Sequence, residues 1–570
     1  MVAKYIFTTQ CCKEYFIAMN TNTPFSIRSV RMGAVPIIQQ VTATLGLEGI
    51  FREHVKHDTR DKLPVSQVLV SALCNIILER YPLYKMGHWA LQRGMVTEDK
   101  ADCFNDDRIG RALDRLFIAD RAALIGAVTV KAINTFKIDA SRIHNDSTSI
   151  KLFGDYADYE EVEKAAKPAR SQNSKDHRPD LKQVVFSLSV AGDGAVPLYF
   201  KVWDGNTTDD TTHLSNWMSL RTLVGHVKFI YVADCKLCVR DTMLFIDTEG
   251  GIFITVMPET RSEIGRFQQW IQTGNPEWQE ALRLPNTHDK EGPPRLFWTY
   301  DSPFLSSEGF RIVWVKSSAK QFEDEQRRTQ KIERTESLLT ELSAKAHKNR
   351  DRLEKTVAGI LKKYNTEAYF DYQIVNDVEE TFKQQQRGRP TENTTFRKVE
   401  TVTYRLSWCQ KPDKIQYDAR YDGIFPLITN HTAPAAEILK NYKYQPYLEK
   451  RHEQLKSVYN VAPVFLRNPQ RIESLLLLYF LGMLITSLIE RKVRKEMEMR
   501  EMPSIPIYPE NRPCKSPTAD KLIGLFSDVR LQYICQNGAV LQTVPDELSK
   551  VQALVLDLMG LKPAEFYRTG

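Results

Sequence analysis

The order of β-rich and helical runs between residues 137 and 234 restricts the fold more than any other feature of this sequence. Apolar and β-branched residues predict three successive strands, at residues 137–146, 184–190 and 196–202. The segment 191–194 (AGDG), between the second strand and the third, is typical of a hairpin turn. A predicted helix at 211–223 then leads to the run 227–234 (VKFIYVAD), which has the composition of a buried strand.

An antiparallel meander followed by a helix and a buried strand is the order that a ribonuclease-H-like core requires. Because 570 residues exceed one compact core, we expect several domains in a mixed α+β fold. The expected parts are a flexible arm (1–25), an all-helical N-terminal domain that could bind DNA (26–128), the first part of the catalytic core (129–250), an insertion with strands and a long charged helix (251–425), the second part of the core (426–499), and a C-terminal tail with a small helical region (500–570).

Apolar spacing predicts the individual elements outside the core. Residues 35–117 follow a helical pattern, in which Asn105 is the expected N-cap of one helix. Residues 321–363 predict a single long charged helix, which we interpret as solvated or self-associating, and residues 433–456 predict another helix. Strand-like runs are expected at 251–256, 310–315, 399–408 and 423–429.

One apolar run, residues 475–489, is a candidate membrane segment. It is shorter than the ~20 residues that a helix needs to cross a bilayer, and charged residues follow it directly. We therefore expect a buried helix at about 470–497 and no membrane partner.

Composition indicates an ordinary globular protein with a mild excess of positive charge. The formal charge of +7 suits a polyanionic partner without establishing one. Nine cysteines form no regular framework, which favours reduced thiols in a cytoplasm. Cys235 and Cys238 make a C-x-x-C pair, but because no second pair lies near them in the sequence, a zinc or redox site is disfavoured.

Two aspartates lie where the predicted strands end. Asp146 closes the first strand and Asp234 closes the buried strand. If those strands are neighbours in a sheet, both carboxylates lie at one edge and reach the same cation. Mg²⁺ prefers such oxygen ligands, and a pair of ions can activate an attacking oxygen and stabilise a leaving one. Either aspartate alone would be read as a strand-end cap.

A third carboxylate comes from the predicted helix at 433–456. At about 100° per residue, Gln445, Glu449 and Lys456 fall within about 60° of Tyr442 and share one helical face. On such a face the carboxylate of Glu449 could bind a metal ion, while the side chains of Lys456 and Tyr442 could contact a phosphate. Pro446 is expected to kink the helix and to move Tyr442 away from this face.

The spacing of these residues resembles the Tyr-x2-Arg-x3-Glu-x6-Lys signature of bacterial insertion-sequence DDE transposases of the cut-and-paste class. Tyr442, Glu449 and Lys456 match the signature, and Gln445 stands at its arginine position. Asp146, within Asn-Asp-Ser-Thr, is similar to the first aspartate motif of the family, and Asp234 is similar to the second. A strand-rich insertion before the glutamate is also a trait of that family, and the resemblance covers roughly residues 30–500.

The resemblance implies cleavage at terminal inverted repeats and strand transfer into target DNA, with two Mg²⁺ ions that Mn²⁺ can replace. Asp146 would bridge the ions, while Asp234 and Glu449 would each complete one. Tyr442, Gln445 and Lys456 would occupy the phosphate-contacting positions. The resemblance further implies a homodimer on double-stranded DNA, in the bacterial cytoplasm and associated with the nucleoid.

Two further segments are candidate DNA contacts. Arg387-Gly388-Arg389-Pro390 resembles the core of an AT-hook, and a flexible basic loop is the alternative. His177 and Arg178 are expected either to contact phosphate or to shape the entry to a strand. Two other functions stay open: a ribonuclease-H-like nuclease, and a DNA-binding protein without catalysis.

Overall fold

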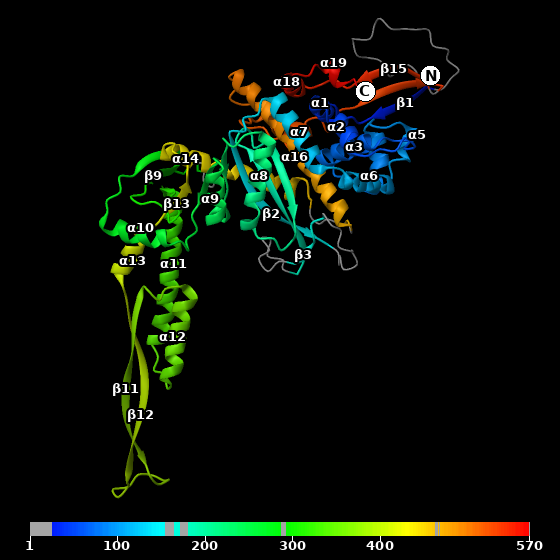
Figure 1. Ribbon diagram of the computed structural model, residues 1–570. Coiled ribbons are helices and arrows are strands. Elements are labelled where there is room, and N and C mark those ends of the chain that lie inside the picture. The colour runs from blue at the N-terminus through cyan, green and yellow to red at the C-terminus, as the bar shows by residue number, and fades with distance from the viewer. Residues whose placement is uncertain are drawn as a thin grey trace. The chain divides into compact units, whose positions relative to one another are not determined.

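The computed structural model describes residues 25–153, 165–170, 180–286, 292–461, 466, 468–537 and 539–568, and the fold is mixed α/β with several sheets (Figure 1). The chain divides into two compact units. Unit 1 is Met1–His226 with Pro446–Gly570, and unit 2 is Val227–Gln445. Unit 1 therefore combines the N-terminal and C-terminal parts of the chain, and unit 2 is continuous in sequence.

Unit 1 begins with a group of helices. Their bounds are α1 Val35–Leu45, α2 Leu47–His54, α3 Val65–Leu78, α4 Met86–Gln92, α5 Glu98–Ala101, α6 Asp106–Ile118 and α7 Arg121–Phe136. The helical pattern predicted for 35–117 is confirmed. As predicted, Asn105 caps α6, because its side chain accepts a hydrogen bond from the N–H of Arg108. Gly46 ends α1 in the left-handed conformation (φ 65°) that glycine adopts without steric cost.

Helix α16, Pro469–Met499, is the buried helix of unit 1. Among the described residues it is the one helix that is long and apolar enough to cross a membrane. However, 94% of its most apolar 18-residue window is buried inside the protein. The predicted burial of this segment is confirmed, since α16 packs against α3, α6 and α1.

The sheet of unit 1 is the predicted antiparallel meander. Strand β2, Arg142–Leu152, pairs with β4, Lys182–Ala191, and β4 pairs with β5, Pro197–Trp203; the short β3, Ala169–Arg170, also pairs with β4. The turn between β4 and β5 closes with a hydrogen bond from the N–H of Ala191 to the carbonyl of Val196 (2.9 Å), and Gly194 there has a φ of 79°.

One detail of this sheet was predicted wrongly. We expected Asp146 to close its strand, but β2 continues to Leu152, which pairs with Lys182 of β4. The strand is longer because β4 begins early enough to supply hydrogen-bonding partners along its whole length. Asp146 consequently lies in the middle of β2, opposite Leu188.

The two faces of this sheet are covered differently. On one face, Phe186 stacks on Phe200 with ring centroids 5.3 Å apart, and Phe200 stacks on Phe480 of α16 at 4.8 Å. The other face is polar, and helix α8, His213–Val224, contacts it through Asn216, whose amide donates to Ser187 Oγ at 2.7 Å. Because side chains alternate along a strand, Asp146 belongs to the first face and Ser147 to the second.

The C-terminal region differs from the predicted helical tail. It contains β14, Leu531–Gln536, and β15, Ala539–Pro545, besides α17, Ala519–Gly524, α18, Lys550–Met559, and α19, Pro563–Phe566. Strand β14 also pairs with β1, Phe25–Val30, so the two ends of the chain form one three-stranded sheet. Sequence patterns did not reveal this pairing, because β1 exposes most of its side chains. Of the arm predicted for 1–25, only Phe25 belongs to the described residues.

Unit 2 contains a mixed group of strands. Strand β6, Ile230–Val232, is parallel to β7, Ile252–Val256, and α9, Arg240–Thr248, connects them. The strands β13, Ile424–Thr429, β10, Arg311–Ser317, β9, Arg295–Asp301, and β8, Gln279–Leu284, follow β7 in antiparallel order. The four predicted strand-like runs of the insertion each overlap an observed strand, whereas β6 is shorter than the predicted 227–234.

The long helix predicted at 321–363 is two helices. They are α11, Ser318–Ser343, and α12, Arg350–Tyr364. Two sets of hydrogen bonds stabilise the break. His347 exchanges backbone hydrogen bonds with Tyr404 of β12, and the Asn349 side chain caps α12 by accepting the N–H of Arg352. Both helices pack on the long hairpin of β11, Phe370–Gln384, and β12, Phe396–Gln410.

The helix predicted at 433–456 is also interrupted. Helix α14, Ala435–Tyr442, ends before α15, Gln445–Glu453, and a π-helical turn, Gln454–Val458, follows α15. Pro446 is the second residue of α15. Backbone N–H groups in the first turn of a helix make no hydrogen bond within the helix, so a proline is tolerated there. The helix therefore restarts at Gln445 instead of kinking at Pro446.

Candidate active site

Asp146 lies on the face of β2 that contacts His452 of α15. Its Oδ1 accepts a hydrogen bond from the N–H of Ser147 at 2.8 Å, and its Oδ2 lies 3.8 Å from Nε2 of His452 on α15. The His452 side chain is 9% exposed and that of Asp146 is 24% exposed, so the carboxylate is accessible from one side. When His452 is protonated, the two groups form an ion pair.

A second carboxylate lies close to the same strand. Ser147 Oγ donates a short hydrogen bond to Oδ1 of Asp209, which belongs to a 3-10 turn, Asp209–Thr211, ahead of α8. Asn145 joins the same polar face, and its amide donates to Ser189 Oγ at 2.8 Å. Sequence reasoning missed both Asp209 and His452, because neither lies in a recognisable pattern with Asp146.

Glu449 lies on α15, three residues before His452. Residues at this spacing are neighbours on a helix, with Cβ atoms about 5–6 Å apart. Leu448, Arg451 and His452 are buried, whereas Glu449 is exposed. Glu449 is thus one helical turn from the imidazole that contacts Asp146, with its carboxylate directed to solvent.

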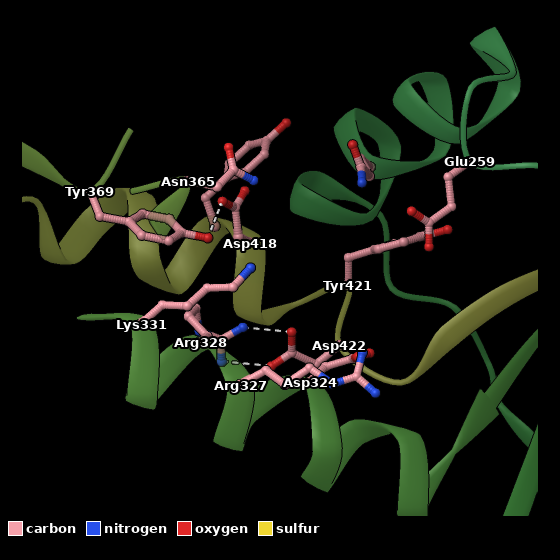
Figure 2. Close-up of a pocket in the computed structure, with 12 residues that line it drawn as sticks. Glu259, Asp324, Arg327, Arg328, Lys331, Asn365, Tyr369, Asp418, Tyr421 and Asp422 are labelled. Atoms are coloured by element: carbon pink, nitrogen blue, oxygen red, sulfur yellow. Dashed lines mark hydrogen bonds and ion pairs between the residues drawn. The ribbon is translucent and has the colours of Figure 1, made fainter. Parts of the chain in front are cut away.

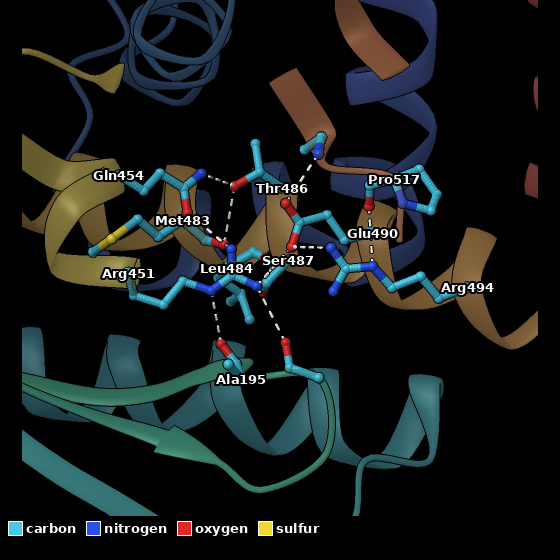
Figure 3. A network of polar contacts seen from close by, with 12 residues as sticks. Ala195, Arg451, Gln454, Met483, Leu484, Thr486, Ser487, Glu490, Arg494 and Pro517 are labelled. Carbon is cyan, nitrogen blue, oxygen red and sulfur yellow. Dashed lines mark hydrogen bonds and ion pairs between the residues drawn. The ribbon is translucent and has the colours of Figure 1, made fainter. Parts of the chain in front are cut away.

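A buried ion pair fixes the position of α15 (Figure 3). Arg451 donates from Nε to the carbonyl of Ala195 at 3.0 Å and from Nη2 to the carbonyl of Gly194 at 3.1 Å. The same Nη2 lies 2.8 Å from Glu490 Oε2 of α16, and the two side chains are 8% and 7% exposed. We refer to Arg451, Glu490 and the two carbonyls as the α15 clamp. The clamp joins α15 to both the β4–β5 turn and α16.

Glu490 also has partners outside the clamp. Its Oε1 accepts the N–H of Ala519 at 2.9 Å, and its Oε2 lies 3.7 Å from Arg494. Gln454 extends the network, since its Oε1 accepts a hydrogen bond from Arg451 Nη1 at 2.9 Å. Most hydrogen-bonding positions of the buried Glu490 carboxylate are therefore occupied, as a buried charge requires.

Gln445 and Glu449, four residues apart on α15, share a face of that helix, whereas Tyr442 and Lys456 lie outside α15. Tyr442 is in unit 2, where it packs into the apolar cluster around Leu427, with its ring centroid 6.4 Å from that of Phe425. Gln445 is 7% exposed, and Lys456 belongs to the π-helical turn after α15. The break after α14 and the wider π turn change the angular relation that an unbroken helix would have given.

Asp234 follows β6 in unit 2. Its Oδ1 accepts the N–H of Lys236 at 3.1 Å, so the side chain caps a 3-10 turn, Cys235–Leu237. Its carbonyl accepts a hydrogen bond from the hydroxyl of Thr255. Tyr231 is fully buried, and this burial, together with the charge of Asp234, raises the pKa of its hydroxyl. The strand end that the sequence predicted for Asp234 is observed.

The C-x-x-C pair lies directly after Asp234, in the 3-10 turn Cys235–Leu237 and the residue that follows it. Burial raises the pKa of the Cys238 thiol to about 12, which disfavours its thiolate. Across the described part of the chain, no three His, Cys, Asp or Glu side chains are grouped closely enough to hold a metal ion. His177 and Arg178 lie outside the described residues.

Arg387 and Arg389 lie in the exposed turn that joins β11 to β12, within unit 2. The sequence left two interpretations of this segment, a DNA contact or a flexible loop. Its position at the end of a paired hairpin was not predicted.

Comparisons with known proteins give three findings. A family described as a domain of unknown function (DUF4277) matches residues 27–130. No curated protein matches the chain. Among solved structures, the chain is similar to a cryo-EM structure of the piggyBac transposase synaptic complex with hairpin DNA, with 9% sequence identity and a TM-score of 0.37, over 88% of this chain and 82% of that chain.

Proposed function

We propose that this chain is a DDE-type transposase that binds the terminal inverted repeats of an insertion sequence and catalyses Mg²⁺-dependent DNA cleavage and strand transfer. One observation carries the proposal: α15, which bears Glu449, is held against the strand that bears Asp146, with His452 Nε2 3.8 Å from Asp146 Oδ2. The contact joins the two elements of unit 1 that carry proposed ligands, β2 with Asp146 and α15 with Glu449, and so supports the proposal.

The order of elements supports the same interpretation. The meander of β2, β4 and β5 precedes α8, and Asp234 then ends a strand that runs parallel to β7. This is the order of a ribonuclease-H-like core. Asp234 is the third ligand of the proposal.

The donor set fits the proposed metal. All three groups are carboxylates, the hard oxygen ligands that Mg²⁺ prefers, and Asp146 and Asp234 are each only partly buried. A bound pair of ions would supply activation of the attacking oxygen and stabilisation of the leaving one. The α15 clamp holds the helix that carries Glu449, while Lys456 and Tyr442 are proposed phosphate contacts. We further propose that Mn²⁺ can replace Mg²⁺, that a homodimer acts on DNA, and that the protein works at the bacterial nucleoid.

The direct test is a nicking assay on linear DNA that carries the element's own ends, with and without Mg²⁺. Asp146→Ala, Asp234→Ala and Glu449→Gln should each lower the nicking rate about a hundred-fold or more, because each removes a ligand of the ions, while binding of the same DNA persists. Glu453→Gln is the matched control, since it changes an exposed carboxylate on the same helix. Equal nicking by Glu449→Gln and wild type would refute the assignment.

Product analysis separates the related functions. Joining of a free 3′-hydroxyl end to a second DNA supports the transposase. Mg²⁺-dependent cleavage without joining would identify a nuclease instead. Stable binding without either product would identify a DNA-binding protein that lacks catalysis.

A further inference from the structure

The hairpin of β11 and β12 forms a long two-stranded arm on unit 2 (Figure 1). We define the arm as residues 370–410 and its tip as residues 383–398. The strands pair in continuous antiparallel register from Phe370↔Gln410 to Gln384↔Phe396. Since a strand rises about 3.3 Å per residue, each strand spans roughly 50 Å.

The base of the arm is supported, but its outer half is not. Ile374, Tyr404 and Leu406 pack on α11 and α12 around Leu339 and Val357. On the same face of the ribbon but farther out, apolar side chains are 43–66% exposed; they are Val378, Phe382, Phe396 and Val402. The arm therefore extends beyond the helices that stabilise its base.

An ion pair and a hydrogen bond fix the root of the arm to the rest of unit 2 (Figure 2). Arg328 of α11 contacts Asp422 through two parallel hydrogen bonds of 2.6 Å, with side chains 13% and 10% exposed. Tyr369, just before β11, donates its hydroxyl to Asp418 at 2.9 Å. Burial, together with this hydrogen bond, raises the pKa of Tyr369 to about 12. These contacts line a pocket of about 430 Å³ and hold the two sides of the root together.

Charge is segregated along the arm. The tip contains five basic residues and one acidic residue, Glu392; the basic ones are Lys383, Arg387, Arg389, Arg397 and Lys398. The remainder of the arm, its shaft, contains five acidic residues and one basic residue, Arg405; the acidic ones are Asp371, Asp377, Glu379, Glu380 and Glu400. Lys398 marks the boundary, since its ammonium lies 2.6 Å from Glu380 and 3.0 Å from Glu400.

The tip presents Arg387 and Arg389 on an ordered turn. Gly388 between them has a φ of 141°, which favours glycine, and its carbonyl accepts a hydrogen bond from the Gln384 side chain at 3.1 Å. The turn closes further through the N–H of Thr391 and the hydroxyl of Thr394, 2.7 Å apart. Both arginines are exposed, and neither forms an ion pair with any residue that the structure describes.

We infer that the tip of the arm binds duplex DNA, with Arg387 and Arg389 in the minor groove. The inference rests on the proposed function and deepens it by naming a part of unit 2 that contacts the DNA. A minor groove of about 6 Å admits guanidinium side chains but not a two-stranded ribbon, so only the turn enters. The acidic shaft is repelled by phosphates, which confines contact to the tip. Because A·T tracts narrow the groove and strengthen its negative potential, the tip should prefer A·T-rich duplexes.

The test measures binding of the full chain to A·T-rich and G·C-rich duplexes by fluorescence anisotropy, at several salt concentrations without Mg²⁺. Each contact that neutralises a phosphate contributes about 0.9 to the slope of log K against log salt. The double variant Arg387→Gln/Arg389→Gln should therefore make the slope shallower by up to about 1.8, and it should bind A·T-rich and G·C-rich duplexes equally well. Netropsin, which occupies the minor groove, should weaken wild-type binding more than binding of the variant.

Arg405→Gln is the matched control, because it removes the same charge from the shaft of the same ribbon. Arg405 is paired with Asp377 at 2.8 Å, so this variant should keep the wild-type slope. An unchanged slope and an unchanged A·T preference in the double variant would overturn the inference. Unchanged DNA binding with altered self-association in sedimentation would also overturn it, and would assign the tip to a protein partner.

The nicking assay keeps this inference separate from the proposed function. A reduced slope in the double variant supports DNA binding by the tip, even if the wild-type chain never nicks DNA. Conversely, Mg²⁺-dependent nicking together with an unchanged slope refutes the role of the tip and leaves the transposase proposal standing.

Discussion

The α15 clamp gives the most informative prediction about unit 1. We consider Arg451→Met, which keeps much of the length of the side chain but removes the charge and the donors. The variant leaves the buried Glu490 carboxylate without its closest cation, 2.8 Å away, and leaves the carbonyls of Gly194 and Ala195 without the guanidinium.

The expected loss of stability follows from these contacts. Removing one partner of a buried ion pair typically costs about 3–5 kcal/mol. Glu490 keeps the N–H of Ala519 at 2.9 Å and has Arg494 at 3.7 Å, which favours the lower end of that range, about 3 kcal/mol. The lost carbonyl hydrogen bonds add about 1 kcal/mol. We therefore expect a loss of about 4 kcal/mol in unit 1.

Hydrogen exchange read by mass spectrometry suits this measurement, because a chain of two units need not unfold in one transition. A loss of about 4 kcal/mol corresponds to roughly thousand-fold faster exchange in amides that exchange through the opening of α15. Peptides from unit 2 should be unaffected and serve as an internal reference. Nicking should fall together with the protection of α15, because Glu449 is held through that helix.

Two further variants test the reasoning. Arg451→Met/Glu490→Met removes both charges, so it should recover more than half of the loss, since apolar side chains can replace a buried ion pair. Arg500→Gln removes a solvent-accessible partner of Asp557 and should change stability little, because exposed ion pairs contribute little. A loss for Arg451→Met no larger than that for Arg500→Gln, with α15 still protected, would refute the role of the clamp.

Two remaining predictions concern unit 2. Burial raises the pKa of Glu308, but hydrogen bonds from Arg261 and Ser306 outweigh burial and lower this pKa to about 2. The ionised Glu308 therefore stabilises the fold fully above the ordinary glutamate pKa, and this contribution is lost as the pH falls from about 4.5 towards 2. Acid titration followed by circular dichroism should show weaker acid dependence in Glu308→Gln than in wild type. Cys409 is exposed, whereas burial raises the pKa of Cys238 to about 12. A thiol reagent at neutral pH should therefore label Cys409 before Cys238, and equal labelling of the two in the native protein would contradict the burial of Cys238.

The sequence predicted elements with strong local patterns. The meander of unit 1 was predicted because apolar runs flank an Ala-Gly-Asp-Gly turn. Helix α16 was predicted because charged residues directly follow its apolar run, which favours a buried helix over a membrane segment. The pairing of β1 with β14 was not predicted, because such pairing joins opposite ends of the chain and leaves no periodicity in either strand. The length of β2 beyond Asp146 was not predicted either, because it depends on pairing with β4 and not on the sequence of β2 itself.

The candidate site shows the same division between local pattern and tertiary contact. Spacing along an ideal helix predicted that Tyr442, Glu449 and Lys456 share a face, but that argument assumes an unbroken helix. The chain restarts at Gln445 and widens into a π turn at Gln454, and each change rotates the residues beyond it. What sets the orientation of Glu449 is instead Arg451, which the signature does not include and which binds carbonyls of a turn more than 250 positions earlier in the chain. A buried charge outside the signature, Arg451, therefore determines where the helix that carries Glu449 lies.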